Sequence, residues 1–170
     1  ELLSGARRQI FVVFAAFMMV EKFGFEVHQL TALFLINLVI NIFAAPLFGY
    51  FIAHFGERRA LLIEYSGLIC VFLAYGGIYL FDWGVVLAAM LFILDHLFFG
   101  LRIALKTYFQ KISSPEDIAP TAAVALSINH IAAIFLPVLL GLLWLVSPAI
   151  VFLAAAFLAF LSLLLALLVP

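Results

Sequence analysis

Charged residues are scarce in this sequence. Asp, Glu, Lys and Arg together make up 10% of its 170 residues, whereas about a quarter of the residues in ordinary globular proteins are charged. The formal net charge is −1, so the chain lacks the basic excess typical of nucleic-acid-binding proteins. We therefore expect neither a separate soluble domain nor a nucleic-acid partner.

Cysteine is almost absent as well. The single Cys70 lies in an apolar run, which excludes a disulfide within the chain and a cluster of thiolate metal ligands. The sequence also lacks a Gly-x-Ser-x-Gly turn, a His-Glu-x-x-His helix and a phosphate-binding glycine loop. We expect no enzyme activity, no cofactor and no metal.

Apolar residues dominate the sequence. They make up 69% of the chain, and the mean hydropathy is +1.35. A membrane-spanning helix needs about 20 mostly apolar residues, and the runs here are apolar on all sides, unlike the strands of a membrane barrel. The sequence predicts an all-α membrane protein, a single domain over 1–170 that forms a bundle of six transmembrane helices. The predicted spans are 2–20, 30–52, 60–80, 85–109, 120–146 and 148–169.

The distribution of Lys and Arg predicts an orientation. With the first loop outside, the outer loops contain only Lys22, and the other basic residues lie on or nearer the opposite side. Positive residues concentrate in cytoplasmic loops, so both ends of the chain are predicted to be cytoplasmic in a cell (inner or plasma) membrane. The sequence begins at Glu1 without a methionine, and we expect the natural N-terminus to lie upstream.

The loop after the second predicted span carries a family resemblance. Residues 49–59 read Gly-Tyr-Phe-Ile-Ala-His-Phe-Gly-Glu-Arg-Arg. This stretch resembles the signature loop of the major facilitator superfamily, Gly-x-x-x-Asp-Arg-x-Gly-Arg-Arg/Lys-Arg/Lys, which joins the second and third helices of each six-helix half. The matching positions are Gly49, Gly56, Arg58 and Arg59, and the differing ones are Ala53, His54 and Glu57.

The resemblance implies a fold and a partner. A partial match is common in the second half of these transporters, so the chain is similar to the C-terminal six-helix half of a major-facilitator fold. In that family two halves enclose a central cavity. The resemblance therefore implies a second six-helix half, either upstream in the same chain or as a second copy.

Two arginines interrupt the first predicted span. Only twelve uncharged residues separate Arg8 from Glu21, about 18 Å at 1.5 Å per residue, which is shorter than a ~30 Å hydrocarbon core. Either Arg7 and Arg8 reach the cytoplasmic interface, or they lie at membrane depth in a helix that begins upstream. In the second case their planar donor groups would hold a carboxylate or a phosphate.

The fourth span contains the most ionisable residues. Asp95 and His96 lie near its middle, and Arg102 and Lys106 follow on the helical face of Asp95. Ionisable residues inside membranes face a bundle interior or a water-filled cavity. A cavity-lining carboxylate would suit proton coupling, and a structural ion pair with a neighbouring helix is the alternative.

Further polar residues lie within other spans. Asn129 and His130 are halfway along the fifth span, where the histidine would relay protons, contact a solute or bridge two helices. Asn37 and Asn41 are one turn apart in the second span, and hydrogen bonding between helices is their expected role. Glu64 is expected to pair with Arg58 or Arg59.

These features predict a permease half that moves a small polar solute by alternating access. An anionic solute held by Arg7 and Arg8, and proton coupling through Asp95, His96 and His130, are further hypotheses. The main alternative is a non-transporting six-helix subunit that assembles with a partner or as a homodimer. A weaker one is an intramembrane enzyme that uses Asp95 and the histidines. The expected partners are the lipid bilayer, the solute and the second half.

Overall fold

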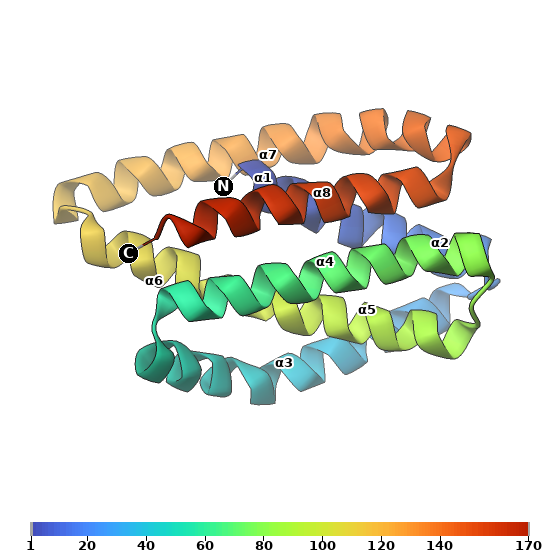
Figure 1. Ribbon diagram of the computed structural model, residues 1–170, viewed down its shortest axis with the longest axis horizontal. Coiled ribbons are helices and arrows are strands. Elements are labelled where there is room, and N and C mark those ends of the chain that lie inside the picture. The colour runs from blue at the N-terminus through green and yellow to red at the C-terminus, as the bar shows by residue number, and fades with distance from the viewer. Residues whose placement is uncertain (1, 170) are drawn as a thin grey trace.

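The computed structural model describes residues 2–169 as a bundle of long helices joined by short loops (Figure 1). The elements are α1 (Leu2–Gln9), the π-helix η1 (Ile10–Ala15), α2 (Ala16–Glu21), α3 (Val27–Phe55), α4 (Glu57–Phe81), α5 (Val85–Gly100), α6 (Ile103–Ile112), α7 (Pro115–Val146) and α8 (Pro148–Leu167).

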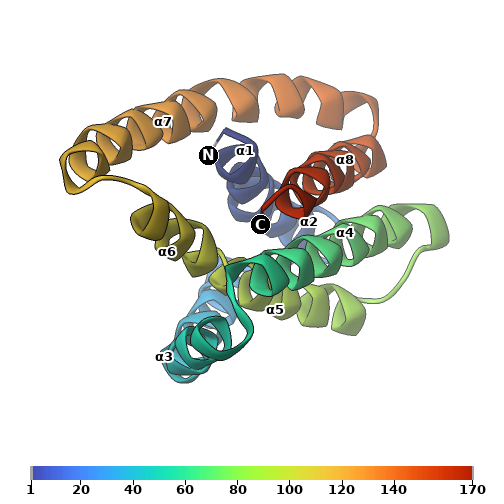
Figure 2. The same cartoon turned by 60° about the vertical axis from the view of Figure 1, so that its left-hand side comes forward.

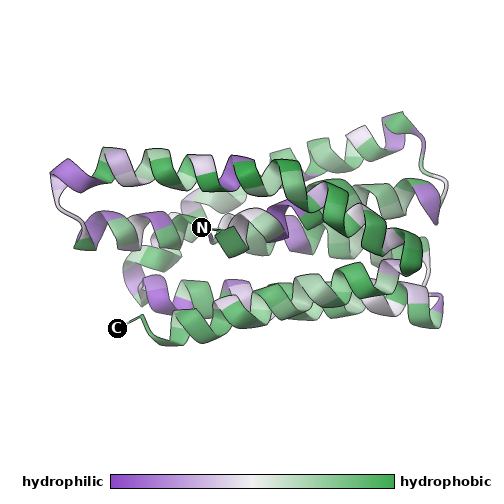
Figure 3. Cartoon of the chain, turned by 90° about the horizontal axis from the view of Figure 1, so that it is seen from above, coloured by the Kyte–Doolittle hydropathy of each residue, from purple (hydrophilic) through white to green (hydrophobic). Residues whose placement is uncertain are grey.

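Six of the resulting helical segments are long and apolar enough to cross a membrane, which confirms a multi-pass helical architecture. α1, η1 and α2 together form the first, and α5 and α6 the fourth. Hydrophilic residues gather at the two ends of the bundle, and the middle of the helices is mostly hydrophobic (Figure 3). Each predicted span coincides with one of these segments.

Three helices begin earlier than predicted: α3 at Val27, α4 at Glu57 and α7 at Pro115. α3 begins at Val27 because Glu26 and Gln29 form a capping box, in which each side chain accepts a backbone N–H of the other residue. α7 begins at Pro115, which tolerates the first helical position since it needs no N–H there. Pro120, the predicted start, therefore lies inside α7.

The first and fourth spans contain irregular turns that the sequence analysis did not predict. η1 widens the first span directly after Arg8 and Gln9. In the fourth span, Arg102 N–H donates to Phe99 O, and Leu105 N–H donates to Arg102 O. These i to i−3 bonds form a tight 3₁₀-type turn, which rotates α6 relative to α5.

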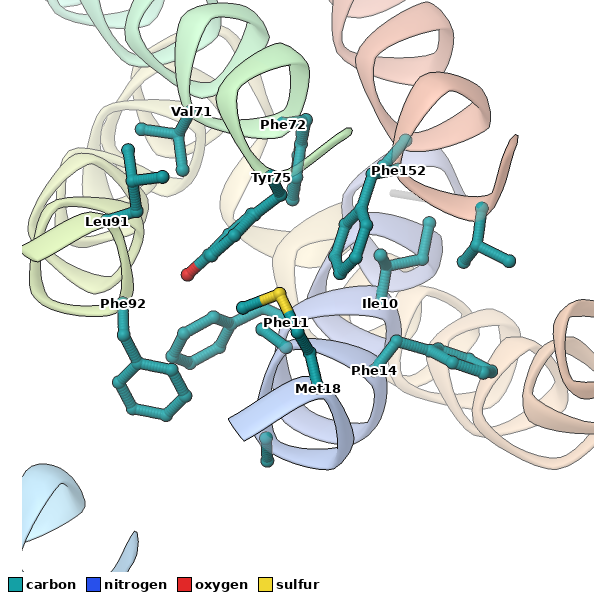
Figure 4. Close-up of a cluster of buried hydrophobic side chains, with 14 of the residues drawn as sticks. Ile10, Phe11, Phe14, Met18, Val71, Phe72, Tyr75, Leu91, Phe92 and Phe152 are labelled. Carbon is teal, nitrogen blue, oxygen red and sulfur yellow. The ribbon is translucent and has the colours of Figure 1, made fainter. Parts of the chain in front are cut away.

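The core lies where the first span meets α4, α5 and α8. α4 and α8 pack along much of their length, and α5 packs on the other side of α4 (Figure 1). Phe11 and Phe14 of the first span contact Phe92 and Trp144, with ring centroids 4.9 and 5.5 Å apart. Figure 4 shows Phe11, Phe92 and Tyr75 converging in this cluster. α3 and α7 lie at the periphery and expose most of their apolar side chains.

Ion pairs mark the two ends of the bundle. Lys22 Nζ lies 2.7 Å from Asp82 Oδ1, which ties together the loops after α2 and α4. Lys111 forms a salt bridge with Glu57 at the other end, where the α3–α4 and α6–α7 loops lie. The loops thus alternate between the ends, as a chain of antiparallel spans requires.

Candidate functional site: a buried charge cluster beside a basic cavity

Arg7 is enclosed by protein. Its side chain is 1% exposed, and its Nη1 lies 4.0 Å from Glu64 Oε1 on α4. The guanidinium carbon is 4.6 Å from the ring centroid of Tyr65, a cation–π contact. Nε donates a hydrogen bond of 3.3 Å to Leu3 O. Together with Asp95, these residues form what we call the buried charge cluster: Arg7, Glu64, Tyr65 and Asp95.

The two acids of this cluster are as buried as the arginine. Glu64 is 0% and Asp95 1% exposed. Among residues 2–169, the Glu64 oxygens and Asp95 Oδ2 have no hydrogen-bond partner, and Arg7 acts electrostatically on both acids. Buried charges are tolerated only when they are paired. Arg7 is therefore a counter-charge for both carboxylates, which lie on two different helices, and Arg102 also acts electrostatically on Glu64.

Arg8 points to another side of α1. A cavity of about 1040 Å³ lies between α1, α6 and α7, and Arg8, Arg102 and Lys106 line it. Figure 2 shows α6 and α7 diverging on either side of α1. We call this space the basic cavity, because none of its described lining residues is acidic.

Neutral polar groups complete the lining. They are Gln9, Tyr108, Gln110, Thr121, Asn129 and His130. His130 Nδ1 lies 2.8 Å from Leu126 O, one turn earlier in α7. A carbonyl oxygen only accepts hydrogen bonds, so Nδ1 carries the hydrogen and Nε2 remains for other partners.

The structure brings some of the predicted site residues together and separates others. Arg8, Arg102, Lys106, Asn129 and His130 share the basic cavity. Arg7 does not line it, because successive residues of a helix point about 100° apart.

Three predicted polar residues, Asn37, Asn41 and His96, lie on α3 and α5. Asn41 Nδ2 is 2.6 Å from His96 Nε2, a hydrogen bond that joins these two helices. Asn41 thus forms a hydrogen bond between two helices, the kind of contact expected of it. Asn37 is 1% exposed, and its amide has no hydrogen-bond partner among the described residues.

Two geometric expectations were wrong. Asp95 does not share the face of Arg102 and Lys106: it is buried while they line the cavity, because the tight turn at 101–102 interrupts the helix. Glu64 pairs with Arg7 rather than with Arg58 or Arg59.

Two members of the buried charge cluster, Glu64 and Tyr65, were not predicted as site residues. Glu64 belongs to the buried charge cluster and could have been found by asking which acid neutralises a membrane-depth arginine. Tyr65 had no such signal, because only the packing of α1 on α4 places its ring against Arg7.

The loop that carries the family resemblance forms a sharp turn between α3 and α4. Gly56 has φ +87°, a backbone conformation that favours glycine. Arg58 donates a hydrogen bond of 3.1 Å to Leu167 O, at the end of α8. The loop therefore ties the second, third and sixth spans together at one end of the bundle.

Within residues 2–169 no group of three His, Cys, Asp or Glu side chains is placed to hold a metal ion. Comparison with family models, with curated proteins and with solved structures finds no match to this chain.

Proposed function

We propose that this chain is one six-helix half of a major-facilitator-type permease, which moves a small polar solute across a membrane by alternating access. The basic cavity carries the proposal. Polar side chains from three helical segments converge on one space of about 1040 Å³. Polar groups inside a membrane bundle commonly mark a solute pathway. The signature-like loop at residues 49–59 and the six spans support the same interpretation.

The test is transport by the full-length protein in proteoliposomes, with labelled phosphate, succinate, glucose and choline as probes. Ala125 lines the cavity, so Ala125→Trp should fill it and abolish uptake. Ala123 is exposed on the same helix and does not line the cavity, so Ala123→Trp is the matched control and should transport normally. Absence of transport for every probe, or equal loss in both variants, would contradict the permease function.

Proton coupling is proposed at Asp95. A carrier that couples to protons needs a group that gains and loses a proton at depth, and Asp95 is an acid buried beside Arg7. Asp95→Asn should abolish accumulation driven by a pH gradient but retain solute exchange. Asp82→Asn, in an exposed loop, is the control. If Asp95→Asn accumulates solute normally, coupling does not depend on this residue.

A second candidate is a non-transporting subunit that pairs with a partner or a second copy. The peripheral helices favour it, since only 11% of the apolar stretch of α3 and of α7 is buried. For a packing subunit, Asp95→Asn would lower assembly rather than accumulation. Chemical crosslinking of the full-length protein in native membranes, followed by mass measurement, separates the two candidates.

A further inference from the structure

The basic cavity has a strong charge bias. Arg8 comes from α1, Arg102 from the turn between α5 and α6, and Lys106 from α6. Their charges face one space of which no described lining residue is acidic. Like charges that face one space repel one another, and an anion bound between them reduces that repulsion.

Among the described residues, three cations outside the cavity have acidic partners, unlike two of the cations that line it. Arg7, Lys22 and Lys111 each form a salt bridge with a carboxylate. In the described part of the chain, no salt bridge joins Arg8 or Lys106 to an acid. Of the cations that line the cavity, Arg8 and Lys106 are therefore the two available to an anionic ligand.

The side chains that line the cavity suit a particular ligand. We propose that the basic cavity binds an anion with at least two negative charges on phosphate or carboxylate groups, held by Arg8, Arg102 and Lys106. Guanidinium groups bind the oxygens of such groups through two parallel hydrogen bonds, and an ammonium adds a point charge. This inference names the substrate class of the cavity and rests on the proposed function for its role as a solute site.

The size and the neutral lining indicate an organic anion rather than a bare ion. About 1040 Å³ is at the upper end of the roughly 300–1,000 Å³ typical of small-molecule pockets. Asn129 and His130 line the side formed by α7. Their amide and imidazole groups can hydrogen-bond the uncharged part of a ligand.

The experiment measures equilibrium binding to the full-length protein in nanodiscs of zwitterionic lipid. The probes are succinate and pyrophosphate, with acetate, glycerol and choline for comparison. Arg8→Gln and Lys106→Gln should weaken binding of the multiply charged probes about tenfold or more, because each loses a charged hydrogen-bond donor. Lys106→Arg should retain binding, which distinguishes lost charge from misfolding.

Matched controls exist on the same elements or nearby. Lys111 is in α6 but pairs with Glu57 outside the cavity, and Arg59 is an exposed arginine at the end of the bundle. Lys111→Gln and Arg59→Gln should bind within about twofold of the wild type, since general charge effects are screened by salt. Equal losses in these controls would overturn the proposal.

An anionic lipid headgroup offers the same chemistry as a soluble anion. If phosphatidic acid co-purifies with the wild type but not with the Arg8→Gln, Lys106→Gln double variant, while soluble anions do not bind, the anion is a lipid. If no anion binds, or if acetate, glycerol or choline binds as tightly, the proposal fails. Transport of neutral solutes alone would refute the proposed anion site but support the permease function. Anion binding without transport would support the anion site but refute the permease function.

Discussion

The buried charge cluster and the basic cavity both begin at α1, where Arg7 belongs to one and Arg8 to the other. Arg7 meets two acids and an aromatic ring and is 1% exposed. Arg8 is exposed and meets two more cations across a cavity. In the first region opposite charges lie together within the protein, and in the second three cations line one space whose described lining contains no acid. The contrast favours a role in stability for Arg7 in the first region and suits the anion binding proposed for the second.

The difference arises from helix geometry rather than from residue type. Two adjacent arginines on a helix point about 100° apart, so a bundle that packs closely on one side of α1 separates them. The side toward α4 is filled by side chains, whereas α7 meets α1 near Gly5 and diverges from α6.

The largest expected effect comes from removing the shared counter-charge. Arg7→Gln should lower the free energy of unfolding by about 3–5 kcal/mol, because it removes the salt-bridge partner of Glu64 and the cation that acts on the buried Asp95. The readout is thermal unfolding of the full-length protein in detergent, followed by size-exclusion chromatography. Arg8→Gln, the control one residue along, should cost far less. Adding Glu64→Gln to Arg7→Gln should restore part of the loss. Equal destabilisation by Arg7→Gln and Arg8→Gln would show that the buried charge cluster and the basic cavity do not differ in their contribution to stability.

A smaller effect is expected at the contact between α1 and α7. A methyl group at Gly5 would overlap the side chain of Asn129, which lines the basic cavity. Because the overlapping atom is the end of the Asn129 side chain, which can turn away, Gly5→Ala should cost stability at the low end of the about 1–3 kcal/mol usual for overpacking. It should weaken ligand binding as well. Gly141→Ala is the control, since open space surrounds a methyl group there. A Gly5→Ala protein with unchanged stability and binding would show that this contact does not shape the cavity.

A neutral polar contact should contribute less than the buried charges. Asn41 and His96 are hydrogen-bonded between α3 and α5. A double-mutant cycle with Asn41→Ala and His96→Ala should give a coupling energy of about 0.6 kcal/mol, the mean for hydrogen bonds between membrane helices. Asn37→Leu should be neutral or stabilising, since its amide has no hydrogen-bond partner among residues 2–169. A coupling as large as the loss in Arg7→Gln would contradict this ranking.

The smallest effect is expected at the exposed ion pair. The hydrogen bond from Lys22 lowers the pKa of the Asp82 carboxyl below its ordinary value of 3.8. A lowered pKa means that the pair stabilises the fold above about pH 3.8 and that this contribution disappears as pH falls through the folded-state pKa. Asp82→Asn should therefore change the melting temperature slightly at neutral pH, less at high salt, and not at all in strong acid. A large shift that salt leaves unchanged would indicate a structural role beyond the ion pair.

Much of the architecture could be predicted, because the hydrocarbon core of a bilayer offers no hydrogen-bond partners to the backbone. A chain with 69% apolar residues must satisfy its backbone hydrogen bonds within each span, which leaves helices of about 20 residues or more. Charged and turn residues then set the boundaries to within a few residues. The capping-box residues Glu26 and Gln29 and the Ser114–Pro115 pair are local signals in the sequence that place the starts of α3 and α7 more closely.

The sequence by itself determined that the chain forms six apolar helices, and which of their residues are unusual at membrane depth. Only the tertiary structure decided which of those residues meet. The π-helix at Ile10–Ala15 and the tight turn at 101–102 change the direction of side chains beyond what regular helical spacing predicts. Glu64 meets Arg7 through the packing of α4 on α1, a contact between residues far apart in the chain. Pairing across helices depends on rotation and distance between elements, and hydropathy carries information about neither.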